Sequence, residues 1–223
     1  MSRTTQYSAV NLIQGAGVDA ERWNRLPSME TIDTTVKAIQ AHGIRVIVVE
    51  NGDDALAALQ RIIPRGAEVM NGSSTTLAEI GYEDLLSGGK SGWKDLHMVV
   101  TSENDDAKRA ELRRKSVAAD YFVSSANAIA ETGEIVACDM SGSRVGAWPF
   151  AAGHLVLVVG INKIVPTLED ALRRVREYAY RLEDARARKA YGIPSMIGKC
   201  VILAQEKAPD RVILILVKES LGY

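Results

Sequence analysis

The chain has 223 residues, of which 47% are hydrophobic, so a single domain with a sizeable core is expected. Its 27 Lys and Arg nearly balance its 28 Asp and Glu, which gives a formal net charge of −1. A nucleic-acid-binding domain usually carries a basic surplus, whereas the one basic stretch here, residues 173–189, also contains Glu177, Glu183 and Asp184. This stretch predicts a solvated helix face, and we expect no nucleic-acid partner.

The sequence has no run of about 18 apolar residues, so no membrane-spanning helix is expected. The first residues, MSRTTQYSAV, lack the apolar core of a secretion signal. The two cysteines, Cys138 and Cys200, lie among apolar neighbours, which favours buried free thiols over a disulfide framework. Together these features predict a cytoplasmic protein.

Residues 1–27 show no clear pattern and form an unassigned N-terminal segment, whereas helices and strands alternate from residue 28 onward. Ser28 is a possible helix N-cap, and apolar residues at helical spacing predict a helix up to about His42. The later elements are predicted from β-branched runs, helix formers and Gly or Pro breaks. The predicted strands are 44–49, 67–70, 96–100, 121–124 and 155–159, and the predicted helices are 55–63, 77–80, 105–118 and one capped by Thr167.

Two antiparallel hairpins are expected in addition. Residues 128–130 and 135–138 are predicted to pair across the turn 131–134. Residues 199–204 and 212–217 are predicted to form a closing pair of strands, joined by a turn at 207–210. Because strands that alternate with helices indicate a mainly parallel sheet flanked by helices, the predicted fold class is α/β with added antiparallel hairpins.

Two polar loops follow predicted strands, which is where open α/β sheets bind ligands. The loop from Gly72 to Thr76 leads into a helix start, so its N–H groups and hydroxyls could hold a phosphate or carboxylate. A plain capped βα turn is the alternative for this loop. Ser125 and Asn127 offer donors and acceptors after strand 121–124, and local turns are the alternative for them.

Two further candidates lie in and after the predicted hairpin. Glu131 and Asp139 would support acid–base or nucleophilic chemistry if they faced one pocket, although the sequence alone favours an exposed turn at Glu131. The loop 141–144 places Arg144 beside Gly and Ser, where its guanidinium could clamp an anion, whereas a lone arginine is usually a surface charge. The three histidines show no metal-ligand spacing, and no metal site is expected.

Four segments, taken in their order along the chain, carry a more specific signal. They are NGSSTTLAEIGYEDLL (71–86), ADYFVSSANAIAETGEIVACDMSGSRV (119–145), VLVVGINKIVPTLEDALRRVR (156–176) and VILILVKESLGY (212–223). They resemble the lactate-utilisation (LUD) domain family, in its short single-domain branch, and imply an LUD domain over residues 28–223. The resemblance also implies a fold similar to that of the sugar-phosphate isomerase and CoA-transferase group, in which Gly/Ser loops at strand ends bind sugar phosphates or CoA esters.

The family segments and the chemistry of the loops together define the candidate site. Glu131 and Asp139 are the candidate catalytic residues. The candidate ligand-binding residues are Gly72, Ser73, Ser74, Thr75, Ser125, Asn127, Thr132, Gly133, Gly142, Ser143, Arg144, Asn162 and Lys163. We expect these polar stretches to line one cleft at one rim of the sheet.

The chain departs from the family pattern in two places. Ser143 precedes Arg144 where relatives often read GxGNR, and Cys200 stands alone where many short-branch relatives carry several cysteines. One thiol cannot hold zinc or an iron–sulfur cluster. No flavin, haem or nicotinamide signature is visible either, so no cofactor is expected in this chain.

Three functions stay open at this point. By resemblance, the chain is a component of L-lactate or other 2-hydroxy-acid utilisation that binds a small anion (carboxylate, phosphate or CoA-like), with iron–sulfur partner subunits supplying the redox cofactor. Alternatively, it is a stand-alone enzyme acting on a sugar phosphate or an acyl/CoA-type substrate through a carboxylate base or nucleophile. A non-catalytic sensor or scaffold is the third possibility. Relatives of the fold often associate, so a homodimer is expected.

Overall fold

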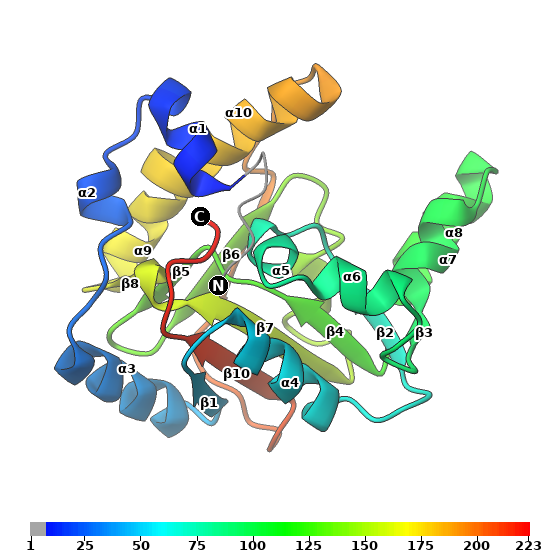
Figure 1. The fold of residues 1–223 in the computed structure, drawn as a ribbon, viewed down its shortest axis with the longest axis horizontal. Helices are drawn as coiled ribbons and strands as arrows, with labels where there is room; N and C mark the ends of the chain where they lie inside the picture. The colour runs from blue at the N-terminus through cyan, green and yellow to red at the C-terminus, as the bar shows by residue number, and fades with distance from the viewer. Residues whose placement is uncertain (1–7) are drawn as a thin grey trace.

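A six-stranded, all-parallel sheet forms the centre of the computed structural model, which describes residues 8–223 (Figure 1). Residues 1–7, which include most of the stretch considered as a secretion signal, lie outside the described residues. The strand order is β1-β10-β7-β4-β2-β3. The strands are β1 (Arg45–Val49), β2 (Glu68–Asn71), β3 (Lys94–Asp95), β4 (Tyr121–Ser124), β7 (His154–Gly160) and β10 (Val212–Val217).

Two interior strands, β7 and β10, are buried on both faces. Every residue of β10 is buried, and its sequence VILILV is the continuous β-branched and aliphatic run typical of a covered parallel strand. Alternate residues of β7 belong to different core clusters, with Leu155 and Leu157 on one face and Val156 and Val158 on the other. The predicted parallel sheet, flanked by helices, is therefore confirmed.

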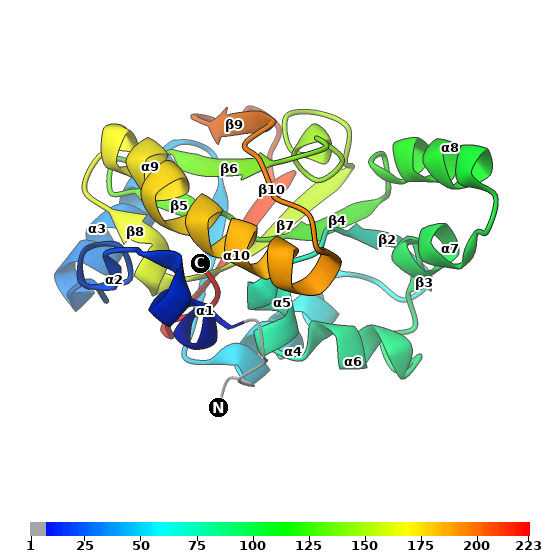
Figure 2. The same cartoon turned by 90° about the horizontal axis from the view of Figure 1, so that it is seen from above.

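A second sheet of four strands lies against one face of the first (Figure 2). Its order is β8-β5-β6-β9, formed by β8 (Ile164–Val165), β5 (Ala128–Ala130), β6 (Ile135–Asp139) and β9 (Lys199–Leu203). The predicted hairpin of β5 and β6 is confirmed. The predicted pairing of β9 with β10 is wrong, because β9 pairs with β6 and β10 lies between β1 and β7.

Helices cover both sheets and complete a layered molecule. One face of the parallel sheet packs against α4 (Gly52–Ile62), α5 (Thr75–Glu79) and α6 (Tyr82–Ser87), and the other packs against α3 (Met29–Ala41) and the second sheet. The outer face of the second sheet is covered by α1 (Ala9–Ala16), α2 (Ala20–Trp23) and α9 (Leu168–Arg174). Helix α9 continues through a π-helical segment (Val175–Ala179) into α10 (Tyr180–Tyr191).

The predicted helix starts at Ser28 and Thr167 are confirmed, since each side chain accepts a backbone N–H from the residue three positions on. The unassigned segment before residue 28 contains α1 and α2, and Trp23 from α2 is buried. The predicted strand 96–100 is wrong: it is helix α7 (Leu96–Ser102), whose first turn is capped by the Asp95 carboxylate at Met98 N.

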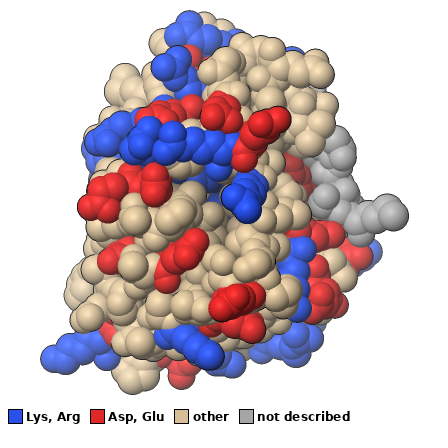
Figure 3. All heavy atoms as spheres, turned by 90° about the vertical axis from the view of Figure 1, so that its left-hand side faces the viewer, with Lys and Arg blue, Asp and Glu red and all other residues tan. Residues whose placement is uncertain are grey.

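Helices α7 and α8 (Asp106–Ser116) form a pair that projects beyond the edge of the parallel sheet (Figure 1). We call this pair the α7–α8 arm. The opposite side of the molecule, made by α2, α3 and α9, carries a band of Lys and Arg with Asp and Glu directly beside it (Figure 3). The ion pair Arg173–Glu177 lies within the stretch 173–189 and agrees with the predicted solvated helix face. Among the described residues, none of the helices has the length and apolar character needed to cross a membrane.

Candidate ligand-binding site

A cleft of about 1480 Å³ opens at the carboxyl ends of β2, β4 and β7. Its walls are the loops that follow β2, β4 and β6, together with the α7–α8 arm, α10 and the segment 191–197, which we call the rim segment. Figure 2 shows α10 and the arm on the two sides of these strand ends. The cleft therefore occupies the position in which open α/β sheets bind their ligands.

Most of the predicted site residues line this one cleft, although they come from four separate loops. The structure places there Gly72, Ser73, Ser74, Thr75, Ser125, Asn127, Asp139, Gly142, Ser143, Arg144 and Lys163. The first and last of the polar loops touch directly, since a Cβ added at Gly72 would lie 2.8 Å from Arg144 Cδ. Glycine is required at this position because the arginine side chain occupies the space.

Three predicted site residues lie elsewhere, and the expectation of one shared cleft is wrong for them. Glu131, Thr132 and Gly133 form the turn at the far end of β5, because that strand separates them from Asn127. Gly133 packs on α3, where an added Cβ would lie 2.8 Å from His42 Nδ1. Neither Glu131 nor Thr132 lines the cleft, so Glu131 cannot serve as its catalytic base.

Asn162 is buried beneath the cleft and does not line it. Its amide nitrogen donates to Asn24 Oδ1 at 2.7 Å, and its Oδ1 accepts the N–H of Leu221 at 3.1 Å. Asn162 therefore connects α2 to the residues after β10, and its role in the structure is to hold these two segments.

The Asp139 carboxylate holds the loop that carries Arg144. It accepts the backbone N–H groups of Gly142, of Arg144 at 3.0 Å and of Val145 at 3.1 Å. A carboxylate that accepts several backbone N–H groups is fixed in place by them. Asp139 lines the cleft, but its contacts identify it as a positioning residue.

Arg144 in turn connects three strand ends. Its guanidinium donates to Ser125 O at 2.7 Å, to Asn127 Oδ1 at 3.3 Å and to the carbonyl of Cys138. The side chain is half-buried, and burial lowers its pKa from the usual arginine value. Arg144 thus brings positive charge to the cleft while holding the loops together.

Lys163 forms the floor of the cleft. It ends the turn that follows β7, and its ammonium donates to Thr76 Oγ1 at 2.9 Å, Ser125 Oγ at 3.2 Å and Ala126 O at 3.0 Å. The side chain is 2% exposed, and among the described residues it forms no ion pair. Burial, followed by the nearby charge of Arg174, lowers the pKa of Lys163 well below the usual lysine value.

Two buried charged residues near the floor were missed by the sequence reasoning. Arg174 on α9 donates to the carbonyl of Trp23 at 2.9 Å and to that of Asn127, and burial lowers its pKa to about 10. Glu79 on α5 accepts the N–H of Gly222 at 2.6 Å, and burial raises its pKa. The available signal for Arg174 was its place on the apolar stripe of its helix, between the buried Ala171 and Tyr178.

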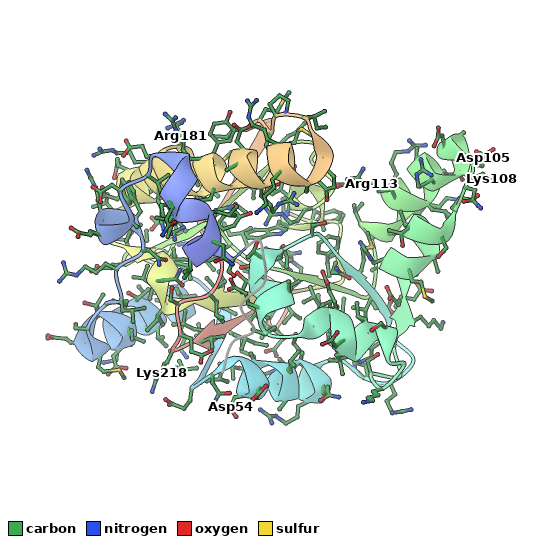
Figure 4. All side chains as sticks on the ribbon, turned by 45° about the horizontal axis from the view of Figure 1, so that its top comes forward. Asp54, Asp105, Lys108, Arg113, Arg181 and Lys218 are labelled. Carbon is green, nitrogen blue, oxygen red and sulfur yellow. The ribbon has the colours of Figure 1, made fainter. Side chains whose placement is uncertain are left out.

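The outer part of the cleft is basic on one side and apolar on the other. Helix α8 contributes Arg109, Arg113 and Arg114. Arg113 reaches across to Ser143 Oγ at 2.8 Å and Ser141 Oγ at 3.2 Å, on the side of the arm that faces α10 (Figure 4). The rim segment opposite exposes the large apolar residues Tyr191, Ile193, Met196 and Ile197.

The described residues contain no group of three or more His, Cys, Asp or Glu that could hold a metal ion. Both cysteines are free, but Cys200 is exposed and Cys138 only partly buried, so the prediction of buried thiols is wrong. The reason is that β9 lies at the edge of the second sheet and β6 borders the cleft.

The fold and the cleft define an α/β protein with a ligand-sized cleft at the carboxyl ends of a parallel sheet. A family model described as LUD domain matches residues 32–217, and the chain belongs to this family. At the level of the family, it is a protein related to lactate utilisation.

A solved structure agrees with this assignment at the level of the fold. The crystal structure of a DUF162 family protein from Deinococcus radiodurans is similar with a TM-score of 0.50 and 15% sequence identity, over 86% of this chain and 99% of that one. At this identity the likeness concerns the fold alone. None of the curated proteins compared with this chain matches it.

Proposed function

We propose that this LUD-domain protein binds a small organic anion on the floor of its cleft, as a component of 2-hydroxy-acid utilisation. The observation that carries the proposal is the buried Lys163 ammonium, whose three hydrogen-bond partners are all uncharged oxygens. Arg144 and Arg174 add positive charge nearby, and Glu79 is the only buried carboxylate among the described residues. Because a buried charge is costly unless it is compensated, a ligand carboxylate or phosphate would stabilise this floor.

The size and lining of the cleft support a ligand with more than one anchoring point. Small-molecule sites usually occupy about 300–1,000 Å³, and this cleft measures about 1480 Å³. The arginines of α8 would attract a second anionic group, and the rim segment offers apolar surface. A phosphorylated or CoA-like acid would use all of these features, and a simple 2-hydroxy acid would use the floor alone.

Oxidation of a 2-hydroxy acid requires an electron acceptor, which proteins supply through a cofactor. In our proposal this acceptor belongs to iron–sulfur partner subunits, as the family resemblance implies. The LUD-domain chain would then bind and orient the acid or its product. Co-purification of such subunits with the tagged chain from its native cells tests this part of the proposal.

The test of anion binding is a thermal-shift series on the wild-type chain and Lys163→Met. The ligands are L-lactate, ribose 5-phosphate and acetyl-CoA, one from each chemical class. We expect a rise in Tm for at least one class, lost in Lys163→Met and kept in Lys218→Met, whose lysine pairs with Glu50 outside the cleft. Absence of any shift in the wild-type chain, or an unchanged shift in Lys163→Met, would rule out the floor as the anion site.

A stand-alone enzyme is the second candidate, and one observation favours it. A buried lysine with a lowered pKa, such as Lys163, loses its proton more readily and can then act as a base or a nucleophile. Asp139 is held by backbone N–H groups and Glu131 lies outside the cleft, so Lys163 replaces both as the candidate catalytic group. Turnover that is lost in Lys163→Arg while ligand binding is kept would support an enzyme, whereas binding without turnover in the wild-type chain would support a sensor or scaffold.

A further inference from the structure

The chain contains two cysteines, and the fold places them directly opposite each other. Cys138 lies on β6 and Cys200 on β9, and the antiparallel register pairs these two residues. They are 62 positions apart in sequence, and both thiols are free. In an antiparallel pair, directly opposite side chains project from the same face of the sheet.

The backbone contacts show which kind of antiparallel pair this is. The N–H of Cys138 donates to Asn127 Oδ1 at 2.9 Å, and its carbonyl accepts from Arg144. Both polar groups of Cys138 therefore point toward the β5 side of β6, away from β9. It follows that Cys138 and Cys200 form a non-hydrogen-bonded pair of the ladder, in which Cα atoms lie about 4.5 Å apart and side chains approach most closely.

This spacing suits a covalent bond between the two sulfur atoms. Disulfides join residues whose Cα atoms are about 4.4–6.8 Å apart, and the expected spacing falls at the short end of that range. We propose that Cys138 and Cys200 form a reversible disulfide that fastens β9 to β6 at the edge of the cleft. This modification site is independent of which ligand the cleft binds.

The two thiols differ in access, which sets the order of reaction. Cys200 is exposed, whereas Cys138 is partly buried, and burial raises the pKa of Cys138 to about 11. A low-molecular-weight disulfide such as oxidised glutathione is the oxidant. The Cys200 thiolate attacks it and releases one glutathione thiolate; the Cys138 thiolate then attacks Cys200 Sγ and releases the second. The protein loses two protons and two electrons, and the oxidant becomes two thiols.

The bond would act on the wall of the cleft. Strand β9 follows the rim segment, and the N–H of Gly198 already donates to Asp139 O at 3.0 Å at this end of the ladder. Cys138 itself lines the cleft, and its carbonyl holds Arg144. A disulfide at this pair would tether the base of the rim segment to the strand that supports the arginine. Oxidation would therefore restrict how far the rim segment can move away from the cleft.

The test is to incubate the reduced full-length chain with oxidised glutathione and to follow intact mass and free thiols. We expect both thiols to disappear, the mass to fall by two hydrogens with no glutathione retained, and a peptide pair linking Cys138 to Cys200. Dithiothreitol should restore both thiols. Cleavage by chymotrypsin at the exposed Tyr191 should be at least threefold slower in the oxidised chain.

In a matched control, the exposed thiol is moved two residues along β9, to the next position on the same face of the sheet. In Cys200→Ser/Ile202→Cys, the exposed position 202 lies diagonal to Cys138, where Cα atoms are about 7–8 Å apart. Closure should then be at least tenfold slower, and the mixed disulfide with glutathione should persist. The proposal would be overturned by stable glutathione adducts on both wild-type cysteines, by closure at equal rates in the two chains, or by disulfide-linked dimers.

Discussion

The three hydrogen-bond partners of Lys163 are uncharged oxygens. The free energy of unfolding therefore depends on whether the Lys163 amine is protonated. Burial penalises the charged form, so the folded chain binds this proton less tightly than the unfolded chain does. Below the folded-state pKa both states are protonated and the penalty is fully present. Above about 10.4, the ordinary lysine value, both states are neutral and the penalty is gone.

The first prediction follows from the lowered pKa of Lys163 in the folded chain. The free energy of unfolding of the wild-type chain, minus that of Lys163→Met, should rise with pH between the folded-state pKa of Lys163 and about 10.4, because the unfolded state binds more protons there. Urea unfolding of both chains at several pH values measures the difference. A difference that stays constant over this range would mean that the ammonium is compensated in the folded chain.

Asp139 supports a second prediction, in which a cleft carboxylate proves structural. Asp139→Ala leaves three backbone N–H groups of the loop without their acceptor, so we expect a loss of about 1–3 kcal/mol in the free energy of unfolding. Asp139→Asn keeps one acceptor oxygen and should lose less. Urea denaturation measures both. Full stability in Asp139→Ala would show that the carboxylate is free and would return it to the catalytic candidates.

At this scale, the sequence identified the polar loops but not the buried charges. Gly72, Ser125 and Asn127 were placed at one cleft because loops after parallel strands converge at one edge of the sheet, and Arg144 was added because its guanidinium suits an anion. Lys163 was reached only through the family resemblance. Glu79 and Arg174 were missed, because their contacts join residues that lie far apart in sequence, which no local pattern records.

Among the elements, helix α8, the outer helix of the α7–α8 arm, has few buried contacts that fix it to the body. Helix α8 buries Ser116 alone among its residues, and Arg113 bridges to the loop 141–143 across the cleft. Segments with few buried contacts open at low free-energy cost. We therefore expect the Arg113 bridge to limit how far the outer cleft opens.

Removal of this bridge is the third prediction. Arg113→Ala should change the global free energy of unfolding by less than about 0.5 kcal/mol, since the site is a surface position. Amide hydrogen exchange in α8 should nevertheless become several-fold faster. Lys108→Ala, at the outer end of the same helix, is the control and should leave exchange unchanged (Figure 4). Equal exchange in all three chains would show that packing, and not Arg113, holds the arm.

The two wrong element predictions have physical causes. Residues 96–100 form a short apolar run that suits a strand or a buried helix equally, and the Asp95 cap decides for the helix. Strands β9 and β10 are neighbours in sequence, but β10 is apolar on both faces and is covered in the interior of the parallel sheet, between β1 and β7. Strand β9, with exposed residues, fits the edge of the second sheet.

On the scale of the whole molecule, the chain path couples the two sheets. The strands β5 and β6 of the second sheet lie in sequence between β4 and β7, which are paired neighbours in the first. The central core cluster contains residues of both sheets, among them Leu157 and Ile135. Neither sheet can lose its packing without exposing the other, so the described part of the chain should unfold as one cooperative unit.

The three tryptophans make this last prediction measurable, because each reports a different core cluster. Trp148 lies in the central cluster, Trp93 packs on the cluster beneath α4 to α6, and Trp23 belongs to the cluster beneath α9. Three variants, each keeping one tryptophan and carrying Phe at the other two positions, are unfolded in urea. In each variant the fluorescence midpoint should coincide with the circular dichroism midpoint of the same sample. A Trp23 transition at lower urea than the circular dichroism transition would show instead that α1, α2 and the second sheet detach first.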